Sequence, residues 1–401
     1  MAPRISMFSR PKKQSSMRVH PMFASRQHGA LAYRPPLWYR MVRSGLVVLL
    51  LGFLALFIYG LYWFLMAVNF RAEARDWLLA DHADMAIEIG RLEVGGFPLA
   101  LRLDLASLDL STTDGLGRVW GWRGRDLEIS ATPWSPDNIQ LTAGRRQSWT
   151  LGGNDRVFDG QVDDLNIAIA FDDNRIESFK MEVGNARLTR PSDPRALELG
   201  RIDVVYRDLD ASAQATHQTR TADLNLTALG LRLPPSFGLP LGPGVARLDV
   251  QAGLFGPLSI SPGGIGLGNP FDGLGWPAAL ETWRDLGGTV ELERFGLDHG
   301  PLSVRAAGTL ALDENLQPTG AFTARLEGLF ASLTPLREAG WIEPKSAVTA
   351  LVVLGAMVSR PDDAPTYLSV PLSVQGQQMT LGPVGLLGLP TVQWPLLAEP
   401  D

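Results

Sequence analysis

The feature that most constrains this chain of 401 residues is an uncharged run of 27 residues from Ser44 to Phe70. At about 1.5 Å per residue, a helix over this run is longer than a hydrocarbon core of about 30 Å is thick. Aromatic residues gather toward its C-terminal end, as they do where a helix leaves a membrane: Tyr59, Tyr62, Trp63 and Phe64. We therefore predict a transmembrane helix over residues 44–70.

The charges on the two sides of this run predict its orientation. Residues 1–43 contain nine Lys or Arg and no Asp or Glu, whereas the whole chain contains 36 basic and 42 acidic residues. Basic flanks stay on the cytoplasmic side. We expect residues 1–43 to form a disordered, basic cytoplasmic tail, and the chain from residue 71 onward to be exported.

Two alternatives concern the N-terminus. An Ala72-Glu73-Ala74 triplet can end a cleaved secretory signal, although such signals have shorter apolar stretches. Met41 lies directly before Val-Arg-Ser and the apolar run, so translation can also begin there. Either alternative leaves the downstream chain exported.

Alternating apolar residues dominate the exported part and predict strands with one apolar face. The clearest runs are 99–105, 165–171, 179–183, 224–226, 248–250, 302–304 and 310–312. With 42 Gly, 29 Pro and no Cys, the chain is suited to many strands joined by turns, and disulfides and thiolate sites are excluded. The fold class expected is mainly β (α+β): one N-terminal transmembrane helix, then a large, twisted, mostly antiparallel sheet with a few short helices.

The same pattern predicts how the exported part is organised. Residues 71–262 form a β-rich region, residues 263–275 a Gly-rich loop, and residues 276–401 a second β-rich region with two helices, Trp276–Leu286 and Pro344–Ser359. Residues 71–84 are expected to form a short helix leaving the membrane. Gly-Pro pairs at 256–257, 300–301 and 382–383 are expected to open edge strands.

Motifs for chemistry are scarce. None of the five histidines (His20, His28, His82, His217 and His299) has another within three to five residues, and there is no G-x-S-x-G elbow. Gly264–Gly268 matches a phosphate loop poorly, since Pro270 follows. Oxygen-rich residues 172–174 and 313–315 favour hairpin turns over calcium sites.

Three tryptophans, Trp120, Trp122 and Trp134, can form a sugar-stacking platform, but burial of Trp120 and Trp122 on one face is the preferred interpretation. We therefore predict no catalytic, cofactor-binding or metal-binding residues, no cofactor and no enzymatic activity. The acidic exported part argues against a nucleic acid partner.

Several short motifs, taken in order, resemble an uncharacterised envelope family of alphaproteobacteria, domain of unknown function 2125. They are Gly96-Phe97-Pro98-Leu99, Trp122 with Leu127–Ala131 and Pro133-Trp134, Gly300-Pro301-Leu302, Gly308-Thr309-Leu310, Gly320, Leu381-Gly382-Pro383 and Leu389-Pro390. This resemblance covers roughly residues 41–395 and implies no site residues. The layout of an anchor and amphipathic strands is also similar to AsmA-like envelope proteins, which implies a curved sheet that holds lipid.

Three functional hypotheses follow. The leading one is a single-pass protein of the bacterial inner membrane, with its bulk in the periplasm, that holds lipid or a partner on an amphipathic sheet in envelope maintenance. The second is a scaffold in envelope assembly with a closed core and no lipid. The third is a hydrolase of envelope polymers with paired carboxylates.

Overall fold

The computed structural model describes residues 37–79, 85–113, 118–152, 157–172, 175–190, 193–209, 215–257, 259–261, 264–266, 276–359 and 366–392. The chain divides into two compact units, residues 1–58 and 59–401. Most of the predicted disordered tail lies outside the described residues. Its last residues, from Leu37, already belong to the first helix.

Four α-helices are present in the described residues: α1 (Leu37–Leu79), α2 (Trp276–Asp285), α3 (Leu329–Glu338) and α4 (Pro344–Gly355), with a short 3-10 helix η1 (Pro235–Phe237). The stretch Ser44–Ala72 of α1 is long and apolar enough to cross a membrane. The helix expected over residues 71–84 is not separate, because α1 continues without a break to Leu79.

Strands make up most of the described residues after α1, which confirms the predicted fold class. They are β1 (Met85–Ile89), β2 (Leu92–Gly95), β3 (Leu101–Thr113), β4 (Val119–Thr132), β5 (Ser135–Thr142), β6 (Arg146–Leu151), β7 (Val157–Asp172), β8 (Arg175–Arg190), β9 (Asp193–Asp208), β10 (Arg220–Arg232), β11 (Gly244–Phe255), β12 (Ser259–Ser261), β13 (Gly264–Gly266), β14 (Thr289–His299), β15 (Leu302–Leu312), β16 (Pro318–Glu327), β17 (Val358–Ser359), β18 (Tyr367–Gln375), β19 (Gln378–Leu381) and β20 (Val384–Gly388).

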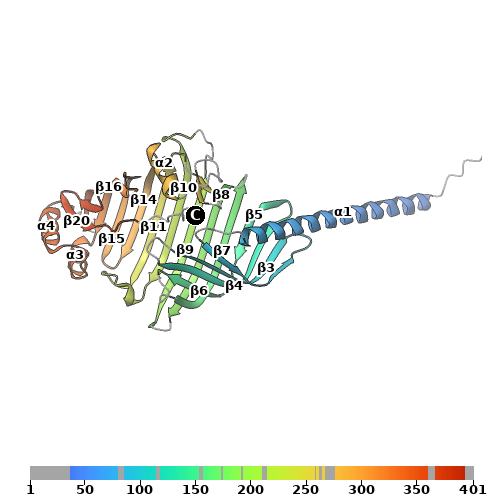
Figure 1. Cartoon of the computed structure of the whole chain (residues 1–401), viewed down its shortest axis with the longest axis horizontal. Coiled ribbons are helices and arrows are strands. Elements are labelled where there is room, and N and C mark those ends of the chain that lie inside the picture. Colours follow the sequence, from blue (N-terminus) through green and yellow to red (C-terminus); the bar gives the residue numbers. More distant parts are fainter. Residues whose placement is uncertain are drawn as a thin grey trace, which may run out of the picture. The chain divides into compact units, whose positions relative to one another are not determined.

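Apart from the small β12–β13 pair, these strands form one sheet of 18 strands, and every pairing in it is antiparallel. Strands that follow one another in the chain lie side by side, so the sheet is a meander (Figure 1). Strands β1 and β2 share one edge of β3, and β5 and β6 together fill the space between β4 and β7. The sheet continues from β11 directly to β14 across the predicted Gly-rich loop.

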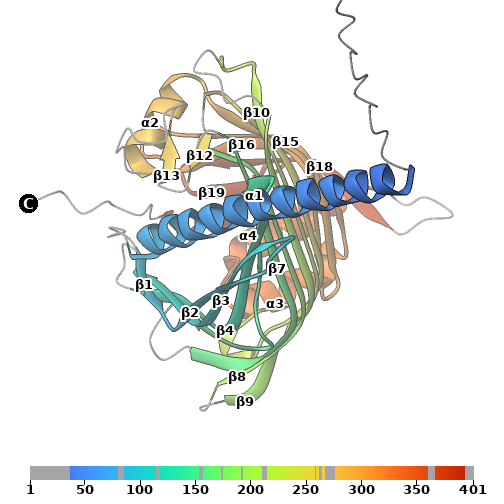
Figure 2. The same ribbon diagram turned by 90° about the vertical axis from the view of Figure 1, so that its right-hand side faces the viewer.

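The long strands bend, and Figure 2 shows the resulting curvature of the sheet. In several strands the two-residue alternation of buried side chains is interrupted at the bend. There, consecutive buried residues are three apart instead of two: Leu105 and Leu108 in β3, Val162 and Leu165 in β7, and Val183 and Ala186 in β8. Residues with positive φ lie at this level, namely Asp126 at 52°, Asn185 at 44° and Gly230 at 64°. Their left-handed backbone turns the pleat, which keeps the apolar side chains on one face on both sides of the bend.

Several short elements cover parts of the sheet. The C-terminal part of α1 buries Ala67 and Phe70 against Leu103 of β3 and Leu127 of β4. Helix α2 packs with Trp283 against residues of β11, β14 and β15, and helices α3 and α4 pack on the C-terminal strands.

Three local expectations were wrong. Gly300-Pro301 lies in the turn between β14 and β15, and β15 is an inner strand, so this pair does not open an edge strand. The helix predicted over residues 344–359 ends earlier, at Gly355, and Val358–Ser359 instead form β17, which pairs with β18. Leu99 lies in a turn before β3, and 68% of its surface is exposed.

Candidate functional site

One face of the sheet presents continuous rows of apolar side chains. The cross-strand register aligns one row over nine strands from β3 to β14: Leu103, Ile129, Leu141, Ile167, Met181, Val204, Leu226, Val250 and Phe295. A second row runs beside it: Ile139, Ile169, Phe179, Tyr206, Leu224, Ala252 and Leu292. We call these two rows the apolar face.

The opposite face of the same strands is polar. Beside the first row, on its side away from the second row, the register places Asp104, Glu128, Thr142, Asn166, Glu182, Asp203, Thr227 and Asp249. Arg201 pairs with Asp203 at 2.6 Å and with Glu182 at 3.4 Å, and Arg247 pairs with Asp249. The hydrogen bond from Arg201 lowers the pKa of Asp203, and that from Arg247 lowers the pKa of Asp249. This face is therefore charged and suited to water.

The β3–β4 end of the apolar face differs from its centre in how it is covered. At the β3–β4 end, Leu103 has 0% of its surface exposed beneath α1. In the centre, Val204, Leu224, Leu226 and Val250 belong to none of the four hydrophobic clusters of the described residues. Leu224 keeps 40% of its surface exposed. The centre thus offers apolar side chains that the described part of the chain leaves partly uncovered.

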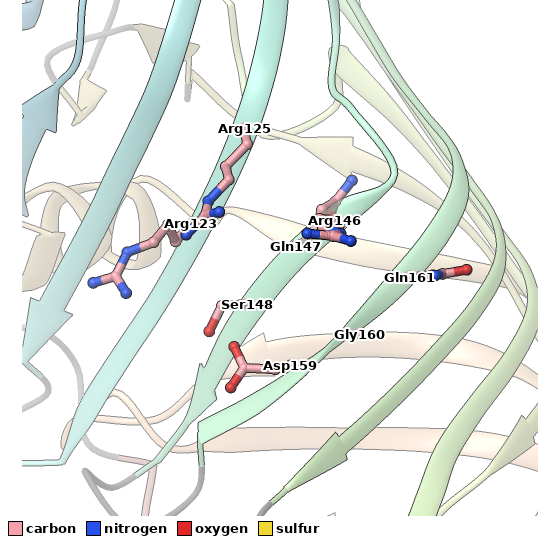
Figure 3. A pocket seen from close by; sticks show the side chains of 8 residues that line it. All are labelled: Arg123, Arg125, Arg146, Gln147, Ser148, Asp159, Gly160 and Gln161. Atoms are coloured by element: carbon pink, nitrogen blue, oxygen red, sulfur yellow. The ribbon is translucent and has the colours of Figure 1, made fainter.

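A hollow of about 350 Å³ lies on the charged face, between β4, β6 and β7 (Figure 3). Its lining consists of Arg123, Arg125, Arg146, Gln147, Ser148, Asp159, Gly160 and Gln161. Arg123 is paired with Asp109. Three arginines beside one aspartate give this hollow a cationic lining, and neither described histidine contributes to it as a base for Ser148. Sequence reasoning missed the hollow, because its residues meet only through the register of three strands.

The structure separates the three tryptophans. Trp122 is half-buried, donates a hydrogen bond of 3.0 Å to Gln147 and lies 6.3 Å from the ring of Trp149. Trp120 and Trp134 are exposed, so the preferred interpretation of core burial, which concerned Trp120 and Trp122, holds for Trp122 and is wrong for Trp120. Trp134 lies in a turn after β4, away from the sheet position of Trp120, so the three do not form one platform.

The other motifs have structural roles in the described residues. Asp313 accepts hydrogen bonds of 2.8 Å from the backbone N–H groups of Asn315 and Gln317, which confirms the predicted hairpin turn. The ring of His299 is buried and lies 2.9 Å from the carbonyl oxygen of Gly242. Gly264–Gly266 form strand β13, and Gly268 lies outside the described residues. Within the described ranges, no three His, Asp or Glu side chains gather as a metal site.

These features define a class: a β-sheet protein with an amphipathic antiparallel meander and one N-terminal helix long and apolar enough to span a membrane. Residues 63–390 match the family described as an uncharacterized protein conserved in bacteria, DUF2125. The chain belongs to this family, as the order of its motifs predicted. No protein of curated function matches it, and no solved structure does.

Proposed function

We propose that this protein is a non-enzymatic, membrane-anchored lipid-holding protein, in which acyl chains lie on the centre of the apolar face. Helix α1 is the anchor. Its basic N-terminal side lies in the cytoplasm, and the sheet lies in the periplasm beside the inner membrane, where it serves envelope maintenance.

The observation that supports this proposal most is the length of the two apolar rows. The first row crosses nine strands and the second crosses seven, and neither contains a charged residue. On the opposite face, the positions beside the first row and away from the second are polar or charged. Strands are about 4.8 Å apart, so seven strands extend over about 29 Å. An acyl chain is long, thin and uncharged, and it gains stability from apolar surface without needing hydrogen bonds.

The anchor is the reason that lipid is the preferred occupant. Both Ala67 and Phe70 of α1 are buried against the first strands of the sheet. The apolar face therefore begins next to the helix that enters the bilayer, and membrane lipid is the apolar molecule at highest local concentration there.

A second candidate function, a scaffold that binds another protein, is favoured by helix α4. One side of α4 is buried through Ala347, Ala350 and Leu354, whereas Val348, Leu351 and Val352 are exposed. An exposed apolar stripe of this kind is typical of a protein contact. Crosslinking in membranes from a position on this stripe, such as Val352, tests for a defined partner.

Lipid mass spectrometry of the full-length protein, extracted from its native membrane without added lipid, tests the leading proposal. We expect the protein to retain lipid, and Leu224→Asp and Leu226→Asp to retain less, because a carboxylate on the apolar face repels an acyl chain. Asn225→Asp is the matched control, since Asn225 lies between them on the opposite face. Equal lipid per protein in all four forms would contradict the proposal, because lipid around α1 alone then explains it.

A further inference from the structure

Two turns of the exported body are joined to the aromatic residues of α1. The hydroxyl group of Tyr59 donates to the carbonyl oxygen of Pro98, and that of Tyr62 to the carbonyl oxygen of Pro133 at 2.7 Å. The indole N–H of Trp63 donates to the carbonyl oxygen of Ala100 at 2.9 Å. All of these residues belong to one compact unit. The two turns are therefore held at the level of Tyr59–Trp63 along α1.

Both turns present large apolar side chains to the outside. The exposed fraction of the residue surface is 56% for Phe97, 68% for Leu99 and 66% for Trp134. The ring of Phe97 meets that of Trp63 edge to face, with centroids 5.2 Å apart. Neither residues 94–101 nor residues 129–135 include a charged side chain. We call Phe97, Leu99 and Trp134 the apolar shoulder.

The length of α1 places the membrane boundary at the same level. The segment from Ser44 to Trp63 has 20 residues and, at a rise of about 1.5 Å each, covers about 30 Å, the thickness of a hydrocarbon core. Beyond it, Ala67 and Phe70 are already buried against the sheet and are not available to lipid. Tyr59, Tyr62 and Trp63 are thus at the depth where aromatic side chains meet lipid headgroups.

We infer that the apolar shoulder inserts into the interface of the bilayer that α1 spans, so that the body is seated on the membrane at a second place. Amphipathic aromatic side chains such as Trp134 are favourable in this region. The two turns carry no charged side chain, so their insertion does not require a charge to be transferred out of water. Insertion fixes the tilt of the body, because the helix and two turns then share one boundary plane. This inference rests on the proposed membrane anchor and does not require lipid on the apolar face.

The absence of cysteine in the sequence permits single-cysteine variants for a direct test. Full-length protein with Leu99→Cys or Trp134→Cys, labelled with an environment-sensitive fluorophore, is placed in vesicles of phosphatidylethanolamine and phosphatidylglycerol containing spin-labelled lipid. Leu54→Cys within α1 reports the anchor. Leu286→Cys is the matched control, since Leu286 is an exposed leucine, 50% of its surface, in the turn that follows α2.

We expect lipid spin-labelled near the headgroup to quench the fluorophore at positions 99 and 134 about twofold more than at position 286, and lipid labelled deep in the chain to quench position 54. If position 54 is quenched but positions 99 and 134 are quenched no more than position 286, the inserted shoulder is refuted and the anchor stands. An unquenched position 54 would overturn the anchor and the shoulder together. Quenching at position 286 equal to that at 99 and 134 would also refute the shoulder, since the fluorophore itself would then be driving insertion. Circular dichroism of each labelled variant checks that the sheet is retained.

Discussion

Truncating one leucine at the end of the apolar face and one at its centre tests whether the centre is less covered by protein than the end. Leu103 and Leu224 both lie on the apolar face, but 0% of Leu103 is exposed and 40% of Leu224. Complete burial of a leucine side chain stabilises a protein by about 1.5–3 kcal/mol. The buried part of Leu224 therefore contributes about 1–2 kcal/mol. For Leu103, truncation also leaves a cavity, and the loss is about 2–5 kcal/mol.

The assay is urea unfolding of the full-length protein in detergent, followed by circular dichroism of the sheet. We expect Leu103→Ala to lower the free energy of unfolding at least about twice as much as Leu224→Ala. A ligand that binds only the folded state raises the stability of that state. Added lipid should therefore raise the free energy of unfolding of the unsubstituted protein by more than it raises that of the Leu224→Ala variant. Equal losses for the two variants, with no effect of lipid, would refute the view that the centre of the face is uncovered by protein.

Three further perturbations test individual elements. Phe70→Ala should lower the free energy of unfolding by about 3 kcal/mol, measured by urea unfolding, since Phe70 is buried where α1 packs on the sheet. Gly328→Ala should lower the free energy of unfolding by more than about 2 kcal/mol in the same assay, because the φ of Gly328 is 70° and an added Cβ would lie 1.8 Å from the carbonyl oxygen of Pro301. An unchanged urea midpoint would exclude this backbone conformation at Gly328. The hydrogen bond from Arg305 lowers the pKa of Asp298, so the stabilisation is present above the unfolded value of about 3.9 and is lost as the pH falls through the folded pKa. Stability of Asp298→Asn should therefore be below that of the native protein at pH 7 and converge with it in acid; parallel pH profiles would contradict this.

Much of the sheet could be predicted from the sequence, because alternation survives wherever one face is apolar. The pairs Ile167 with Ile169 and Leu224 with Leu226 were recognised from period two alone and lie on one face of the sheet, on β7 and β10. The bend could not be predicted, since Leu105 and Leu108 are three residues apart and both buried, which breaks that period.

Other elements were missed for specific reasons. Helix α3 is only ten residues long and contains Pro335, which usually ends a helix, so its sequence did not favour a helix. The arginines of the hollow are on β4 and β6, and only the pairing of these strands brings them together. The apolar shoulder consists of residues whose motifs were recognised, but exposure of Phe97 and Trp134 is a tertiary property.

Photo-crosslinking at two adjacent residues of β10 tests the central claim most directly. A photoreactive amino acid replaces either Leu224 on the apolar face or Asn225 on the opposite face, in full-length protein within its native membrane. Mass spectrometry should find lipid adducts from position 224 and not from position 225. Protein adducts alone from position 224, or equal lipid adducts from both positions, would contradict a sheet that holds lipid on its apolar face.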